Sequence, residues 1–262
     1  MKATLFALFV ALLMVGCGEQ NQSVGSDGEV EDKPFLPSLP SFNLNESEFE
    51  RTKRLAEGGD KVAQGYLGWM YDKGEGVPED KKEAVKWYTK AAEQGDADAQ
   101  HNLGNMYYHG KVDEDGYRNY REAFKWYTKA AEQGVAEDQF FLGEMYGGGF
   151  GVAQDTKEAV KWYTKAAEQG HAEAQWQLGL YYHMIVRQSM RDNVTAYAWI
   201  AVAKENANID QVNHFSLTGV TVQQRVEGSL SMVAQELNKE QIKEAKKLAI
   251  EIQKRIEANQ QD

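Results

Sequence analysis

Few side chains in this sequence could hold a metal ion or act as a nucleophile. The chain has five histidines and one cysteine, Cys17. The histidines are His101, His109, His171, His183 and His214. No two of them stand three or four residues apart, the spacing that would place them on one face of a helix. No second cysteine is available to complete a zinc site. The sequence therefore predicts neither a metal centre nor a cofactor.

A glycine-rich segment at residues 147–151 has the composition of a phosphate-binding loop. It lacks the Lys-Ser/Thr pair of a P-loop and the strand that precedes a dinucleotide-binding turn. No nucleophile-elbow motif is present anywhere in the chain. We expect this segment to be a turn that links two helices, and we expect the protein not to be an enzyme.

The charge of the chain also restricts its partners. The formal net charge is −11, from 29 lysines and arginines against 40 acids. Nucleic-acid-binding proteins need basic patches that contact phosphates. The charge therefore argues against nucleic acid as a partner.

A string of ten residues, KWYTKAAEQG, occurs three times and indicates what positions the other side chains. The copies run over residues 86–95, 125–134 and 161–170. Self-similarity at a period of 36 to 39 residues is typical of solenoids built from helical pairs. Ala84, Trp87, Tyr88, Ala91 and Ala92 show the i, i+3, i+4 spacing of a broad amphipathic stripe. We call this segment helix B, and the glycine that ends each copy suits a left-handed C-cap.

A second pattern lies between the copies and predicts another helix, helix A. A Leu-Gly pair recurs with a Gln three residues before the Leu and a Tyr four residues after it. The four Leu-Gly pairs begin at Leu67, Leu103, Leu142 and Leu178. A glycine inside a helix costs about 1 kcal/mol relative to alanine. We expect close approach of a neighbouring helix to compensate for this cost.

Together the two patterns resemble the Sel-1-like repeat, a member of the tetratricopeptide-like α-solenoids. The resemblance rests on A-x-x-W-Y-x-x-A-A-x-x-G, then A-x-x-Q-x-x-L-G-x-x-Y, then a G-x-G-V turn, and it covers residues 46–208. It implies an all-α, right-handed α-solenoid of about four helix-pair repeats whose helices A line the concave surface. It also implies a role in assembling or regulating other proteins.

The N-terminus has the features of a bacterial lipoprotein. Residues 1–16 hold Lys2, a short apolar run and a small residue, as a signal peptide does. Met14 to Cys17 resembles a lipobox, which implies cleavage before Cys17 and lipidation of that residue. An ordinary secretory signal is the alternative. Residues 17–45 are polar and contain three prolines, so we expect a disordered membrane tether.

From these features we expect a protein of the bacterial cell envelope that is held by a lipid anchor. We expect the anchor to lie in the outer membrane and the protein to face the periplasm. The repeat region should be closed at its C-terminal end by two further helices within residues 209–258. Their apolar residues recur at helical spacing, as in Val222, Val226 and Leu230.

A strip of variable residues on helix A is the candidate binding surface. Helix B is nearly identical between copies, whereas helix A differs at positions spaced i, i+4 and i+7. Aromatic, amide and acidic side chains alternate there, a mixture suited to a protein partner. Simple packing between repeats is the alternative explanation for the aromatic members. The partner-binding residues that we predict are Tyr66, Trp69, Asn102, Asn105, Phe141, Glu144 and Gln177.

The sequence thus favours a membrane-anchored periplasmic or surface adaptor that binds a protein partner through the concave face. Two other functions stay open. One is an envelope hydrolase acting on cell-wall peptides, and the other is a host-facing surface ligand.

Overall fold

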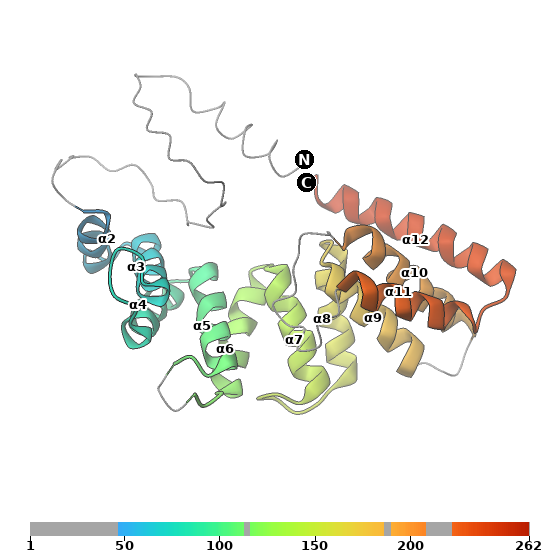
Figure 1. The fold of residues 1–262 in the computed structure, drawn as a ribbon, viewed down its shortest axis with the longest axis horizontal. Helices are drawn as coiled ribbons and strands as arrows, with labels where there is room; N and C mark the ends of the chain where they lie inside the picture. Colours follow the sequence, from blue (N-terminus) through green and yellow to red (C-terminus); the bar gives the residue numbers. More distant parts are fainter. Residues whose placement is uncertain (1–46, 113–115, 186–189, 208–221, 262) are drawn as a thin grey trace, which may run out of the picture. The chain divides into compact units, whose positions relative to one another are not determined.

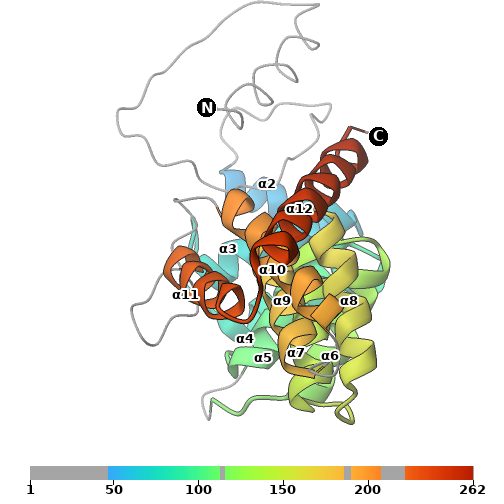
Figure 2. The same cartoon turned by 90° about the vertical axis from the view of Figure 1, so that its right-hand side faces the viewer.

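The computed structural model describes residues 47–112, 116–185, 190–207 and 222–261, and every regular element in these residues is an α-helix. The predicted signal peptide, the tether and Cys17 lie outside the described residues. Within them, each helix is either too short or too polar to cross a lipid bilayer. The helices, shown in Figures 1 and 2, are α2 (Glu48–Glu57), α3 (Lys61–Lys73), α4 (Lys81–Glu93), α5 (Ala97–His109), α6 (Tyr120–Glu132), α7 (Ala136–Gly148), α8 (Thr156–Glu168), α9 (Ala172–Ile185), α10 (Met190–Asn206), α11 (Val222–Ala234) and α12 (Lys239–Asn259).

The helices pack on one another in chain order, as a solenoid of helical pairs does (Figure 1). Helices α3, α5, α7 and α9 are the four predicted helices A, and α4, α6, α8 and α10 are the helices B. The predicted all-α solenoid of about four helix-pair repeats is therefore confirmed.

The first three helices B end where the sequence predicts. The glycines that close the three copies, Gly95, Gly134 and Gly170, have φ angles of 85°, 97° and 91°. These left-handed values are readily adopted by glycine and stop the helix. The next helix A begins at once, and in two cases an aspartate caps it: Asp60 accepts a hydrogen bond from the backbone of Ala63, and Asp96 does so from Ala99.

The glycine inside each helix A is required by a tyrosine of the following helix B. A Cβ added at Gly104 would lie 2.5 Å from the ring of Tyr127, and one at Gly143 would lie 2.5 Å from that of Tyr163. The equivalent distance from Gly68 to Tyr88 is 2.7 Å. Real Cβ atoms do not come this close, so the expected close approach of two helices is confirmed.

A buried glutamine in each helix A joins three helices through one side chain. The side-chain amide of Gln100 donates to the carbonyl of Ala92 in the preceding helix B, at 2.9 Å. Its Oε1 accepts from Gln133 Nε2 of the following helix B, at 2.7 Å. Gln64, Gln139 and Gln175 repeat the first bond, to Ala56, Ala131 and Ala167. Because Ala56 belongs to α2, this helix occupies the place of a helix B before the first repeat.

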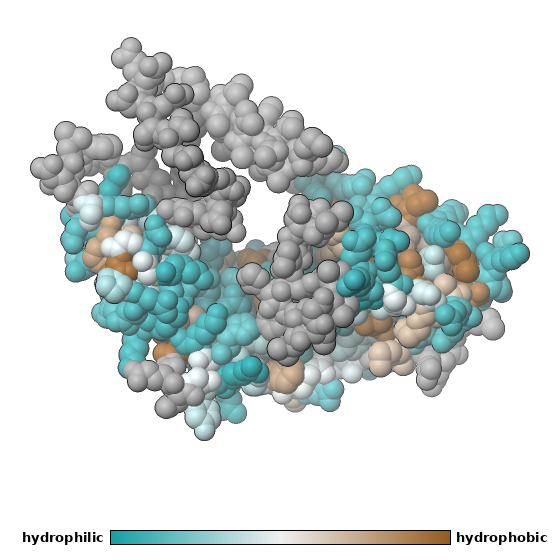
Figure 3. Space-filling model, in the orientation of Figure 1, coloured by the Kyte–Doolittle hydropathy of each residue, from teal (hydrophilic) through white to brown (hydrophobic). Residues whose placement is uncertain are grey.

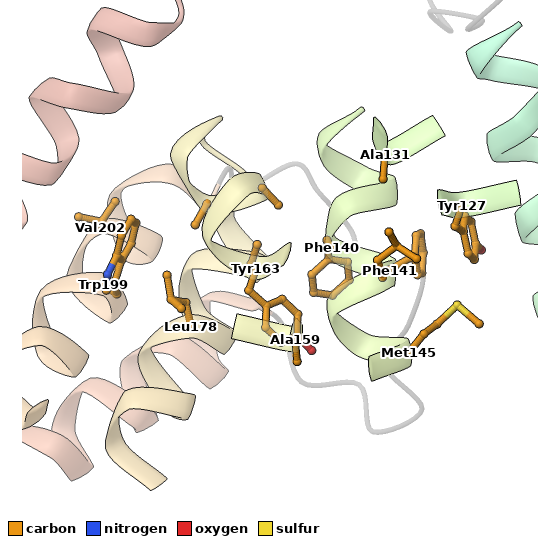
Figure 4. Close-up of a cluster of buried hydrophobic side chains, with 14 of the residues drawn as sticks. Tyr127, Ala131, Phe140, Phe141, Met145, Ala159, Tyr163, Leu178, Trp199 and Val202 are labelled. Atoms are coloured by element: carbon orange, nitrogen blue, oxygen red, sulfur yellow. The ribbon is translucent and has the colours of Figure 1, made fainter. Parts of the chain in front are cut away.

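The apolar core runs between successive helices (Figure 4). In its largest cluster Phe141 of α7 lies beside Tyr127 of α6, and Phe140 points toward Tyr163 of α8. At the C-terminal end α11 and α12 both pack on α10, with Val226, Val233 and Ile256 buried.

Candidate functional site

The candidate surface is the variable strip of the four helices A, which we call the helix-A strip. Each helix contributes three positions, spaced as i, i+4 and i+7. The strip consists of Val62, Tyr66 and Trp69 in α3, Asp98, Asn102 and Asn105 in α5, Glu137, Phe141 and Glu144 in α7, and Glu173, Gln177 and Leu180 in α9.

Two aromatic members of the strip are buried. Tyr66 is 2% exposed and Phe141 is 7% exposed. The ring of Phe141 stacks on Tyr127 of the preceding helix B with centroids 4.9 Å apart. The hydroxyl of Tyr66 donates to Glu48 Oε1 in α2, at 2.6 Å. These two residues therefore follow the packing alternative, and we no longer propose them as anchors for a partner.

The third position in two of the repeats is occupied by an acceptor for a tyrosine hydroxyl. The hydroxyl of Tyr127 donates to Asn105 Oδ1 at 2.8 Å. The hydroxyl of Tyr163 donates to Glu144 Oε1. In each of these repeats, Asn105 or Glu144 thus accepts from the tyrosine whose ring lies against the glycine of the same repeat. An internal contact explains why these two positions are polar.

Two polar contacts join the strip to neighbouring helices toward the C-terminal end. Gln177 Nε2 donates to Glu144 Oε1 at 3.0 Å, which links α9 to α7. Arg225 of α11 pairs with Glu173 Oε1 at 2.8 Å and lies 4.9 Å from the centroid of the Trp176 ring. Part of the last helix A is therefore covered by α11.

The strip has exposed members in the second and third repeats and partly exposed members in all four. Trp69 and Asn102 are partly exposed, and Asp98 and Glu137 are exposed. The ring of Trp69 stacks on Tyr66 at 5.4 Å, so buried packing holds the orientation of this indole. A rigid, partly exposed tryptophan next to amides and acids can make apolar contact and hydrogen bonds with a partner.

The electrostatics of the helices A differ from those of the helices B. Helices α3, α5, α7 and α9 contain six acids and two lysines, whereas α4, α6 and α8 contain ten basic residues and six acids. Burial raises the pKa of Glu144, and nearby Glu173 raises it further. The counts of charged residues make the helix-A side the acidic side of the repeats, which suits a partner with basic groups.

A second polar cluster lies where α5 meets α7. His101 Nδ1 is 3.1 Å from Asp138 Oδ1, and Asn105 Nδ2 is 2.7 Å from His101 Nε2. Burial raises the pKa of Asp138, which is fully buried. An Asp–His pair supports nucleophilic catalysis when the second ring nitrogen faces a serine or cysteine. Here that nitrogen faces an amide, so the cluster lacks the nucleophile that this chemistry needs.

Metal binding is not supported by the described residues, which contain no group of three or more His, Cys, Asp or Glu that could hold an ion. The face drawn in Figure 3 is mostly hydrophilic, with apolar residues in small separate patches. A groove of about 520 Å³ lies between α12 and helices α8 to α10, with Leu178, Trp199 and Ile252 in its lining. The predicted strip residues do not line it.

The Sel1 repeat matches four consecutive segments of the chain, residues 61–96, 97–135, 136–171 and 172–205. The chain belongs to the Sel1 repeat family. Each match contains one helix A and the helix B that follows it, so the family repeat and the structural repeat coincide.

Two solved Sel1 repeat structures resemble this chain. A protective antigen of uropathogenic Escherichia coli with the same fold is 34% identical, with a TM-score of 0.64, and the match covers 80% of this chain and 41% of the antigen. A Sel1 repeat protein of Oxalobacter formigenes is 38% identical, with a TM-score of 0.52 and 58% and 60% of the two chains covered.

A sel1-like repeat-containing protein of Acanthamoeba polyphaga mimivirus is 36% identical over 75 residues, 29% of this chain. The match spans 14% of that protein. This chain therefore corresponds to part of the length of each of the three relatives.

Sel1 repeats generally mediate contacts between proteins and are not a known class of enzyme.

The His101–Asp138 pair of this Sel1 solenoid was not predicted from the sequence patterns. A signal was present, because Asp138 stands where the other repeats have Ala63, Ala99 and Ala174. A polar residue at a position that is otherwise alanine indicates a special contact, but its partner on another helix becomes evident only in the fold.

Proposed function

We propose that this Sel1 repeat protein is an adaptor that binds a protein partner through the accessible part of the helix-A strip. Trp69 and Asn102 are the central contacts, with Gln177 at the edge and the exposed acids Asp98 and Glu137 attracting basic groups.

One observation carries this proposal. The strip varies between repeats, and internal hydrogen bonds explain Asn105 and Glu144 but do not explain Asn102. Trp69 packs on Tyr66, yet part of its ring stays exposed on the strip. A partner that lies along the repeats meets different groups at each step, so variation without an internal cause is what a binding surface requires. The rest of the repeat is nearly copied because packing needs the same residues each time.

Site-specific photo-crosslinking in living cells tests the proposal. A photoreactive amino acid at position 69 or 102 should capture one defined protein, identified by mass spectrometry. The same amino acid at the exposed positions 86 and 125 of helix B is the matched control. The proposal is contradicted if the helix-B positions capture the same protein with equal yield, or if positions 69 and 102 capture none.

We further propose that Cys17 is lipidated and that a tether holds the solenoid at a membrane in the bacterial envelope, with the periplasmic face of the outer membrane as the expected site. The lipobox-like sequence from Met14 to Cys17 supports this. Labelled palmitate should enter the protein, and Cys17→Ser should abolish labelling and release the protein from the membrane fraction. Equal labelling of the variant would contradict lipidation.

A host-facing surface ligand is the second candidate function. The observation that favours it is the 34% identity to a protein described as a protective antigen. Protease added to intact cells distinguishes the two placements, because a surface ligand is digested and a periplasmic adaptor is not.

A further inference from the structure

The third repeat contains a buried carboxylate where the other repeats have a methyl group. Asp138 of α7 is 0% exposed, and the equivalent residues Ala63, Ala99 and Ala174 are equally buried. Burying a carboxylate is costly unless it is paired and hydrogen-bonded. The repeat therefore folds with alanine here, and the aspartate serves some purpose other than completing the fold.

The partner of Asp138 is another departure from the repeat. His101 of α5 has its Nδ1 at 3.1 and 3.2 Å from the two carboxylate oxygens. The equivalent residues of the other repeats are Gly65, Phe140 and Trp176. The two exceptional residues thus belong to different repeats and meet across the contact between them.

Other groups extend this pair into a chain that crosses the contact. Asn105 Nδ2 is 2.7 Å from His101 Nε2, and Asn105 Oδ1 accepts from the hydroxyl of Tyr127. The ring of Tyr127 stacks on Phe141 of α7. This series of side-chain contacts thus begins and ends on α7. Its hydrogen bonds and the apolar packing of the second repeat on the third therefore depend on one another.

We propose that the contact between α5 and α7 is a pH-sensitive joint of the solenoid, in which protonation of His101 strengthens the packing of the third repeat on the second. The charged groups around the imidazole are consistent with this role. Asp98 lies on the same helix, Glu137 and Asp138 lie on α7, and His171, which directly precedes α9, pairs with Glu137 at 3.0 Å. Tyr127 is the titratable group that α6 contributes.

Protonation of His101 changes a defined set of hydrogen bonds. A neutral His101 donates from Nδ1 to Asp138 and accepts at Nε2 from the Asn105 amide. A protonated His101 donates from both nitrogens. The Asn105 amide then turns over, so that its Oδ1 accepts from Nε2 and its Nδ2 donates to the oxygen of Tyr127. The bond from the Tyr127 hydroxyl to Asn105 Oδ1 is broken in this exchange, and the gain that offsets it is the ion pair with Asp138. The proton converts the contact with Asp138 into a buried ion pair.

The direction of the effect follows from the pKa. Burial acts to lower the pKa of His101, but the hydrogen bond and the charge of Asp138 outweigh it and raise that pKa. A raised pKa in the folded state gives stability that is fully present below about pH 6.5, the ordinary histidine value. This stability is lost as the pH rises through the folded-state pKa. Burial also raises the pKa of Asp138, so stability from this carboxyl is likewise lost as the pH rises, beginning from about pH 3.9, the ordinary aspartate value.

Asp138→Ala provides the test, because alanine is the residue that the other three repeats bury at this position. NMR titration should give His101 a pKa above about 6.5 in the wild type and below it in the variant, where burial acts without the carboxylate. As the pH is raised from 6 to 8, the thermal midpoint of the wild type should decrease relative to that of the variant. Amide exchange in α7, corrected for its intrinsic rate, should be slower at pH 6 than at pH 8 in the wild type alone.

His101→Gln should remove the same pH dependence, and it serves as a second variant if Asp138→Ala folds poorly. His109→Gln is the control and should leave the His101 titration unchanged. A wild-type His101 pKa below about 6.5, or equal pH dependence in the wild type and both joint variants, would overturn the proposal.

Discussion

The helices B and the helix-A strip differ in how they vary, and the difference separates packing from recognition. In helix B the same tyrosine, Tyr88, Tyr127 or Tyr163, fills the same glycine gap in three successive repeats. In the strip no two repeats have the same three residues. A residue that is repeated is required by a contact that is repeated, so helix B is the structural half of each unit.

Variation in the strip has more than one cause. Asn105 and Glu144 differ chemically, yet each accepts the hydroxyl of its tyrosine. In the fourth repeat the equivalent position is Leu180, and the tyrosine is replaced by Ile200, so no hydroxyl has to be satisfied. A variable position is evidence for a partner only after such internal contacts have been removed from consideration.

The largest expected effect on stability concerns the copied tryptophan. Trp126→Ala should lower the free energy of unfolding by about 3–5 kcal/mol, because a buried aromatic ring is lost and a cavity remains. Trp162→Ala, at the equivalent but only partly buried position, should cost less. Chemical denaturation measures both, and an unchanged midpoint for Trp126→Ala would show that this stripe does not stabilise the core.

The glycine gap should give the next largest effect. Gly104→Ala places a methyl group against the ring of Tyr127 and should cost about 1–3 kcal/mol despite the better helix propensity of alanine. Gly228→Ala in α11 is the matched control, because a Cβ there meets nothing within 4 Å. That change should stabilise by up to about 1 kcal/mol. Equal effects of both substitutions would mean that the close approach of helices is not what selects glycine.

The smallest effect distinguishes two tyrosines of the same series. Tyr127→Phe removes the hydrogen bond to Asn105 and should cost about 1 kcal/mol. Tyr88→Phe should be neutral or slightly stabilising, because the buried Tyr88 hydroxyl has no hydrogen-bond partner in the described part of the chain. A loss of stability in Tyr88→Phe as large as that in Tyr127→Phe would contradict the explanation given for Asn105.

The repeat architecture could be predicted from the sequence because its signals are local and recur. Gln100, Leu103 and Tyr107 lie on one helix at fixed spacing, so their common face follows from helix geometry alone. The burial of Tyr66 and Phe141 could not be predicted in this way. It depends on which residues of neighbouring helices meet, and spacing within a single helix does not contain that information.

The His101–Asp138 pair shows the same limit, since its two members are 37 residues apart and belong to different repeats. Comparison of aligned repeats shows that each is unusual, but only the fold shows that they touch. The lipidation of Cys17 remains a prediction from the lipobox-like sequence.

The most direct test of the central claim is the affinity of the captured partner for variants of the accessible strip. Trp69→Ala combined with Asn102→Ala should lower the thermal midpoint, because Trp69 packs on Tyr66 and the core. In a variant that stays folded at the assay temperature, the double substitution should also weaken binding by about 30-fold or more if the pair forms a hot spot. Lys86→Ala combined with Lys125→Ala on helix B is the matched control and should bind as the wild type does. Unchanged affinity of a well-folded strip variant, or an equal loss in the helix-B control, would contradict the account.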